Sequence, residues 1–329
     1  MRKLLLGTTA LAAAATLTAN TALADVTISG SYEFKYLSRS SNNSTLDGTT
    51  MSHGDTDMVV NFTSKTDSGL DLTYMVDFNT DPGDDAALGT DENSLTIAGG
   101  FGKIVLGQDD DASDAYTLDE MDGLAEEPAA SLHASASIGT SSSISSDDAM
   151  KVAYHLPAMG GLTAGVSHTD RSAAGGTDTT AYGARYTMDA AGASITLAYA
   201  AVNDENATQD IDHENMGLKV VSGDISLIIS QGGYEADDED RENQGGSISY
   251  KMPNGMTVGA FTFKSEDDLD VGEEYSASGA EIQYNIASGL KATISVVDYD
   301  YKITTANHES TDTSADSGTM TQLTIGASF

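Results

Sequence analysis

Apolar and polar residues alternate along most of the chain, and helical periodicity is nearly absent. The segment DVTISGSYEFKYL at 25–37 places Val26, Ile28, Tyr32, Phe34 and Tyr36 on one face and Thr27, Ser29, Ser31, Glu33 and Lys35 on the other. GLDLTYMVDF at 69–78 and MTQLTIGASF at 320–329 repeat this arrangement. A period of two is typical of β-strands with one apolar and one polar face, so the pattern predicts an all-β protein.

Breaker residues divide this pattern into sixteen predicted strands. They cover 25–37, 55–66, 69–80, 91–99, 101–108, 150–157, 161–170, 179–188, 192–203, 213–222, 224–234, 242–252, 255–265, 275–286, 289–302 and 318–329. In 289–302, Tyr299 and Tyr301 fall on the polar face, which makes this strand a candidate for a β-bulge.

Short and long connections alternate along the whole chain. Short turns such as Gly99-Gly100 and Gly223 are followed by longer polar links at 38–54, 81–90, 109–149, 171–178, 204–212, 235–241, 266–274 and 303–317. One end of the structure therefore carries tight turns and the other carries loops, as in an up-and-down antiparallel barrel. A soluble β-sandwich would not need an apolar face on every strand with a polar second face on nearly all.

The expected strand length suits a membrane. Ten residues at about 3.3 Å each, tilted by about 45°, rise roughly 23 Å, close to the apolar band of about 25 Å around outer-membrane barrels. The polar second faces then imply a wet interior.

The N-terminus predicts an export signal. Met1-Arg2-Lys3 is basic, 4–19 is weakly apolar, and Ala22-Leu23-Ala24 is a small-x-small cleavage site. Residues 1–24 are therefore expected to be removed, which leaves 25–329 as a single barrel domain. Without Arg2 and Lys3, 13 basic residues face 51 acidic ones, so the formal charge is 13 − 51 = −38. Such a surface repels nucleic acid and attracts cations.

The order of these features along the chain resembles that of the general porins of Gram-negative outer membranes. The resemblance rests on the signal peptide, the alternating turns and loops across 25–329, the terminal Phe329, and FGKIVLGQDD leading into a long segment after the fifth strand. It implies a sixteen-stranded homotrimer in the bacterial outer membrane through which small hydrophilic solutes diffuse. It also implies a third outer loop, 109–149, that folds inward as a constriction, and a role for Phe329 as the signal read by the barrel assembly machinery.

The chain departs from relatives of this type in two ways. It has no tryptophan, so Tyr and Phe must form the aromatic girdles. A Pro-Glu-Phe-Gly-Gly loop tip is missing, and EEPAAS stands in its region.

The third loop is the candidate constriction because it is strongly acidic. Its carboxylates are Asp109, Asp110, Asp111, Asp114, Asp119, Glu120, Asp122, Glu126 and Glu127. Clustered carboxylates concentrate cations and exclude anions, so we expect a cation-preferring pore. Acidic loops that only solubilise the surface are the alternative interpretation.

Basic residues fall into two predicted groups. Many members of the resembled family place an arginine cluster opposite the inner loop. Here Arg39, Arg171 and Arg241 fall in or at predicted loops, so Lys35, Lys151 and Arg185 are the candidates for a basic lumen wall. A second group lies beside short turns and is expected to ring the periplasmic mouth, namely Lys65, Lys103, Lys219, Lys251 and Lys291.

Metal and catalytic motifs are weak. Asp109, Asp110 and Asp111 offer the oxygen ligands that Ca²⁺ accepts, but they lack the D-x-[DN]-x-[DN]-G spacing, so weak Ca²⁺ binding is the most we expect. The chain has no cysteine and no H-E-x-x-H or G-x-S-x-G motif, and we expect no cofactor and no enzyme activity.

The sequence thus predicts an outer-membrane porin that passes ions and small hydrophilic solutes. Its expected partners are outer-membrane lipid, lipopolysaccharide, two further copies of the chain, the barrel assembly machinery, and solutes and cations. Two alternatives stay open: a substrate-selective channel on the same barrel, and an acidic surface or adhesion protein without a pore.

Overall fold

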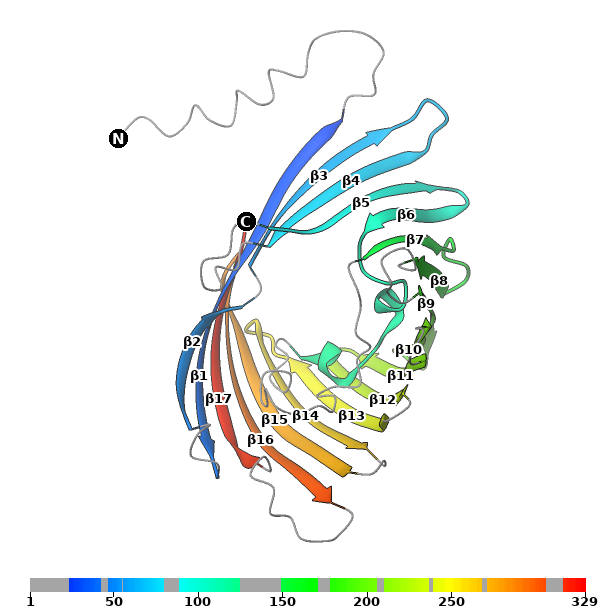
Figure 1. Cartoon of the computed structure of the whole chain (residues 1–329). Helices are drawn as coiled ribbons and strands as arrows, with labels where there is room; N and C mark the ends of the chain where they lie inside the picture. Colours follow the sequence, from blue (N-terminus) through cyan, green and yellow to red (C-terminus); the bar gives the residue numbers. More distant parts are fainter. Residues whose placement is uncertain are drawn as a thin grey trace, which may run out of the picture.

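The computed structural model describes residues 24–42, 47–54, 56–79, 89–124, 149–170, 178–205, 210–236, 239–267, 271–305 and 316–329. Their strands form a single sheet that curves around a central space (Figure 1). The strands are β1 (Asp25–Ser41), β2 (Gly48–His53), β3 (Asp57–Lys65), β4 (Asp71–Asn79), β5 (Gly89–Gly99), β6 (Gly102–Gln108), β7 (Met150–His155), β8 (Leu162–Thr169), β9 (Asp178–Ala190), β10 (Ala193–Glu205), β11 (Asp210–Ser222), β12 (Ile225–Ala236), β13 (Glu239–Lys251), β14 (Met256–Asp267), β15 (Val271–Ala287), β16 (Leu290–Thr305) and β17 (Asp316–Ser328).

The sheet closes on itself. The first strand, β1, pairs with β17 on one side and with both β2 and β3 on the other, and all pairings are antiparallel. Because β2 and β3 continue one another along β1, they form one wall strand with a break at 54–56. The barrel therefore has sixteen strands in its wall, which confirms the predicted fold.

The predicted second strand, 55–66, missed β2. GTTMSH in β2 has Met51 as its one large apolar residue, so no apolar face marks this strand in the sequence. At Gly54, inside the break, a Cβ atom would meet the Glu33 carboxylate and lie 2.7 Å from Cε of Lys35, so the close approach of these side chains requires glycine there.

Side chains sort onto two faces as the alternation predicts. Large apolar residues are exposed on the outer face, among them Ile28, Phe62, Val152, Leu197, Ile229 and Ile294. Inward positions carry small and polar residues such as Ser167, Ala200, Asn215 and Thr324. This arrangement fits a barrel with lipid outside and water inside. Among the described residues, no helix is long and apolar enough to span a membrane.

Several predicted loops are strand instead. The neighbouring strands extend through most of four predicted loops, namely 38–54, 204–212, 235–241 and 266–274. The connections that remain between strands are 42–47, 206–209, 237–238 and 268–270. These polar segments lack an apolar face, and for that reason the sequence predicts loops there. They lie beyond the apolar band, where water solvates both faces, so polar residues can continue a strand there.

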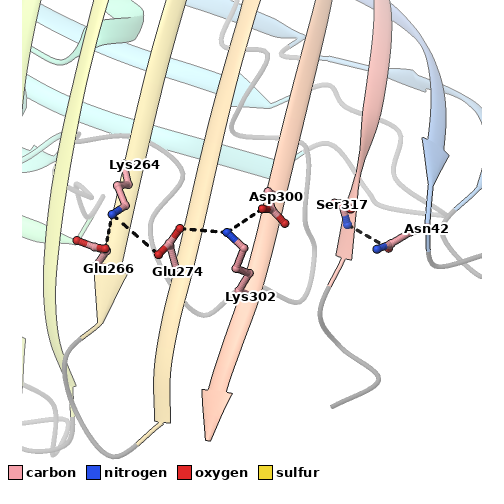
Figure 2. Close-up of polar contacts among 7 residues, drawn as sticks. All are labelled: Asn42, Lys264, Glu266, Glu274, Asp300, Lys302 and Ser317. Carbon is pink, nitrogen blue, oxygen red and sulfur yellow. Dashed lines mark hydrogen bonds and ion pairs between the residues drawn. The ribbon is translucent and has the colours of Figure 1, made fainter. Parts of the chain in front are cut away.

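Charged side chains pair across these strand extensions (Figure 2). On the outer face of β14, Lys264 bonds to Glu266 and lies 3.9 Å from Glu274 of β15. On β16, Lys302 lies 3.3 Å from Glu274 and 2.8 Å from Asp300. Opposite charges on neighbouring strands stabilise the pairing modestly, because these side chains are solvent-exposed.

Part of the interior is an apolar cluster. Phe261, Phe263, Tyr275, Ala277, Val297, Tyr299, Tyr301 and Met320 point inward from β14 to β17 and are buried. The register between β16 and β17 runs without a shift from Leu290 to Tyr301, so the bulge expected at the two tyrosines is wrong. The irregularity lies between Asn285 and Ala287 of β15. The tyrosines face the lumen because they pack in this cluster.

Candidate pore constriction

The chain after β6 turns into the barrel and follows its inner wall (Figure 1). It contains two short 3-10 helices, η1 (Asp114–Tyr116) and η2 (Glu120–Gly123). The first contacts β9 and β10, and the second contacts β12, β13 and β14. We call the described segment 109–124 the inner loop. Its inward course confirms the predicted architecture of the third outer loop.

The second 3-10 helix of the inner loop, η2, is capped at its N-terminus by Asp119. The Asp119 carboxylate accepts hydrogen bonds from the backbone N–H groups of Met121, at 2.8 Å, and Asp122, at 3.1 Å. In return, the Asp122 carboxylate accepts one from the backbone N–H of Asp119 at 3.2 Å. This reciprocal capping box fixes both carboxylates within the loop.

Three basic side chains bind backbone carbonyls of the inner loop. Lys151 of β7 donates to the carbonyl of Asp109, and Arg185 of β9 donates to that of Thr117. Lys219 of β11 donates to the carbonyl of Asp122 at 3.4 Å. Lys151 also pairs with the Asp111 carboxylate at 3.1 Å, and both side chains are buried. The cations thereby attach the loop to the wall at its beginning, middle and end.

Polar wall residues complete the attachment, and sequence reasoning missed all of them. The hydroxyl oxygen of Ser167 accepts from the backbone N–H of Ala112 at 2.9 Å, and the side-chain carbonyl of Asn215 accepts from that of Leu118 at 3.0 Å. The Ser230 hydroxyl donates to the Glu120 carboxylate at 2.7 Å. Their inward parity was visible in the sequence, but nothing there indicated which inward positions the loop would meet.

The acidic residues of the loop divide into two groups. Asp110, Asp114 and Asp122 are exposed toward the lumen, and Asp109 is partly exposed. Asp111, Asp119 and Glu120 are buried against the wall, so their assignment to the open constriction is wrong. Each buried carboxylate has a partner that offsets the cost of its burial: Lys151 for Asp111, backbone N–H groups of the loop for Asp119, and the Ser230 hydroxyl for Glu120. Glu126 and Glu127 lie outside the described residues.

The surroundings of two loop carboxylates change their proton affinity. The Asp114 side chain has access to the lumen, but the surrounding loop and wall remove part of its hydration, and this desolvation raises its pKa; the neighbouring Asp110 raises the pKa further, and Arg185 opposes the rise. Burial also raises the pKa of Asp111, and the Lys151 ammonium offsets part of that rise.

The predicted basic wall is not one surface. Lys151 and Arg185 lie on the side that carries the inner loop and bind it. Lys35 lies on β1 and pairs with Glu33 at 2.9 Å. The error has a simple cause: parity places a residue inside the barrel but does not give its position around the wall.

Two arginines assigned to loops are in strands. Arg39 lies in β1, with its guanidinium carbon 6.0 Å from the centroid of the Tyr299 ring. Arg241 lies in β13, at 5.0 Å from the centroid of Tyr234. Both point inward, since Tyr234 and Tyr299 occupy inward positions of their strands.

The five lysines predicted at the periplasmic mouth all lie in strands near short turns. Lys65 ends β3, Lys251 ends β13, and Lys219 is three residues from the end of β11. Lys103 and Lys291 are each the second residue of their strands, β6 and β16. Lys65 pairs with Asp71 at 2.9 Å, whereas Lys219 reaches the inner loop. Their electrostatic role at the mouth stays a prediction.

The described residues include no cluster of three histidine or acidic side chains suited to a metal ion. Of the three aspartates considered for Ca²⁺, Asp111 is paired with Lys151 and Asp110 is exposed. Weak Ca²⁺ binding by the outer acidic segments stays untested.

A closed antiparallel barrel with an apolar outer face and an inward-folded acidic loop defines an outer-membrane channel. Comparison with family models agrees, because residues 8–329 match the model described as Gram-negative porin. The chain belongs to the Gram-negative porin family, and its location is the bacterial outer membrane. Among curated proteins, comparison by sequence finds none similar to it.

Solved structures share the fold at low sequence identity. OmpT of Vibrio cholerae in its loop L8 deletion form aligns with TM-score 0.69 and 12% identity, covering 93% of this chain and 99% of that one. The in-vitro folded trimer form of OmpT aligns with TM-score 0.67 and 11% identity, with coverages of 93% and 99%. The anion-selective porin from Comamonas acidovorans aligns with TM-score 0.65 and 15% identity, with coverages of 93% and 100%.

Proposed function

We propose that this porin forms a water-filled channel for passive diffusion of ions and small hydrophilic solutes, and that it prefers cations. The observation that carries the cation preference is the division of charges at the inner loop. Asp110, Asp114 and Asp122 are exposed to the lumen, whereas Lys151 is buried and paired with the Asp111 carboxylate. Arg185 and Lys219 bind loop carbonyls and keep their charge, so three exposed carboxylates face two cations at this loop and its net charge toward a passing ion is negative.

The fold by itself does not determine ion preference. A structural neighbour with a similar barrel is described as anion-selective. Selectivity must then come from the side chains that line the passage, since fixed carboxylates raise the local concentration of cations. No catalytic role is proposed for the described lumen residues.

Diffusion can be tested with proteoliposomes. We expect them to swell in isotonic solutions of small neutral sugars, with rates that fall steadily as solute size increases. Uptake of one solute far above others of its size would favour the substrate-selective alternative. No uptake through correctly folded protein would favour the adhesion alternative.

The raised pKa of Asp114 predicts a pH dependence of selectivity. A carboxyl with a raised pKa becomes neutral at a higher pH than an ordinary aspartate, whose pKa is 3.8. Cation preference should therefore decline on acidification while ordinary carboxylates are still ionised. Reversal potentials measured along a pH series check this. The Asp114→Asn variant should lose the part of the decline in cation preference that occurs while ordinary carboxylates are still ionised. An unchanged profile in that variant would contradict the assignment.

We further propose a homotrimer that associates through the wall of β6, β7 and β8. These strands have 7, 6 and 8 residues. A seven-residue strand tilted by about 45° rises only about 16 Å, less than the apolar band of about 25 Å. Their outer face nevertheless carries exposed apolar side chains, namely Leu106, Met150 at 63%, Val152 at 55% and Val166. A second copy would cover this wall better than lipid. The OmpT neighbour is described as a trimer form.

An aspartate in this wall tests the interface. Val152→Asp should convert a detergent-resistant trimer into a folded monomer on unheated gels, because a carboxylate would be buried between copies. The matched control is Ile248→Asp on the outer face of β13, which should leave the trimer intact. Trimers retained by Val152→Asp and lost by Ile248→Asp would place the interface elsewhere.

The C-terminus fits the proposed assembly signal. The N–H of Phe329 donates to the carbonyl of Gly30 at 2.9 Å, which completes the closure between β17 and β1. The Phe329 side chain is 85% exposed and so contributes little to packing. We propose that the assembly machinery reads this ring, and that lipid and lipopolysaccharide surround the outer face. Cleavage of 1–24 remains part of the proposal, since 1–23 lie outside the described residues.

A further inference from the structure

The inner wall contains a groove of small residues beneath the inner loop. On β8, β9 and β10, Gly165, Gly183 and Ala200 are direct cross-strand neighbours. In the adjacent row, Ala198, Gly217, Ser230 and Gly245 are successive neighbours on β10, β11, β12 and β13. The two rows meet on β10, where Ala200 belongs to the first row and Ala198 to the second. Together they form a continuous strip of small inward residues from β8 to β13. Large residues border the second row, with Arg185 on β9 and Phe263 on β14.

The inner loop occupies this groove with four of its side chains. Tyr116 packs over Gly165 and Gly183, Leu118 over Gly217, Glu120 over Gly245, and Leu124 over Gly259 of β14. Tyr116, Leu118 and Glu120 are almost completely buried, with exposures of 5%, 2% and 0%. The exposed carboxylates belong to other positions of the same segment. The loop thus points one set of side chains into the wall and another toward the lumen.

The fit leaves no room for a side chain on these glycines. A Cβ atom would lie 2.6 Å from Cβ of Tyr116 at Gly183, 2.6 Å from Cβ of Leu118 at Gly217, and 2.6 Å from Cγ of Glu120 at Gly245. At Gly259 it would lie 2.6 Å from Cδ2 of Leu124. Gly183, Gly217, Gly245 and Gly259 all have φ outside the left-handed region, so backbone strain does not require glycine there. The close approach of the inner loop is what requires glycine at these four positions.

We infer that this glycine groove sets the width of the passage by fixing how far the inner loop stands out from the wall. Added volume in a well-packed region forces the backbone to shift, so a larger residue in the groove displaces the loop toward the barrel axis. The glycines are positioning residues: they act on solutes only through the loop. This inference rests on the proposed channel function.

Gly245 offers a test that a second variant can reverse, because its close contacts are all with the Glu120 side chain, which is itself completely buried. Gly245→Val should lower single-channel conductance about two-fold, since the displaced loop narrows the water-filled route. Trimming the contacting side chain should restore it, so the double variant Gly245→Val with Glu120→Ala should conduct nearly as the unmodified protein. Folding of each variant is checked by its heat-modifiable gel mobility.

A matched control lies on the neighbouring strand. At Gly233 of β12, which faces outward, a Cβ atom would lie 3.6 Å from Cγ of Glu214 and meets no loop atom. Gly233→Val should leave the conductance unchanged. Should Gly245→Val fail to fold, Gly259→Ala, whose closest contact is the Leu124 side chain, provides the same comparison.

The outcomes separate this inference from the channel function. If the unmodified protein conducts, and the groove variants lower conductance while the control does not, the inference holds. If the unmodified protein conducts and folded groove variants match it, the inference is overturned although the channel stands. Absence of conductance from the folded, unmodified protein removes the channel function itself.

Discussion

Replacing Asp110, Asp114 and Asp122 together with asparagine will lower the ratio of cation to anion permeability several-fold. These three carboxylates are exposed on the lumen side of the inner loop. A unit charge about 5 Å from an ion in water changes its energy by about 0.8 kcal/mol, which is roughly a four-fold change in occupancy. The effect should shrink as salt increases, because the Debye length falls from about 10 Å at 0.1 M to about 3 Å at 1 M.

The control for this triple variant carries the same charge change outside the barrel. Glu214, Glu242 and Asp298 are exposed on the outer face of β11, β13 and β16. Changing them to glutamine, glutamine and asparagine should leave permeability ratios unaltered. Equal effects from both triple variants would mean that overall charge, rather than the inner loop, sets ion preference.

Removing Lys151 will detach the beginning of the inner loop. Its side chain is fully buried, pairs with Asp111 at 3.1 Å and donates to the carbonyl of Asp109. Breaking a buried ion pair on one side costs about 3–5 kcal/mol, because the remaining charge loses its partner. Lys151→Met should therefore lower the temperature at which folded protein converts to the unfolded gel species, and should increase open-channel current noise.

Two further variants make this result specific. Lys151→Met combined with Asp111→Asn removes both charges, so it should recover much of the lost stability. Lys35→Met breaks the more exposed pair with Glu33, in which the lysine side chain is 32% exposed, and should cost about 1 kcal/mol or less. If Lys151→Met behaves as Lys35→Met does, the buried pair does not hold the loop.

The fold was largely predictable because it follows from a period of two that recurs in every wall strand. The split second strand was missed, since β2 has no apolar face to mark it. The strand extensions at 235–241 and 266–274 were read as loops because acidic residues usually indicate solvent-exposed turns. In this barrel they pair beyond the membrane, as Lys264 does with Glu266 and Glu274.

The candidate site was predictable in part. The sequence located the acidic segment, and the resemblance indicated that it folds inward. The sequence could not show that Asp111 and Glu120 face the wall, because the residues that contact them lie on other strands, β7, β8, β12 and β13. Nor could it show that Lys151 and Arg185 bind the loop, because parity fixes the face of a strand but not the partner across the lumen.

The most direct test of the account is the reversal potential of the unmodified protein in a planar bilayer under a KCl gradient. A passage bordered by Asp110, Asp114 and Asp122 should pass K⁺ in preference to Cl⁻, so the dilute side should become positive at zero current. A dilute side that becomes negative, or a potential of zero that persists at low salt, would contradict the proposal that the inner loop makes this channel cation-preferring.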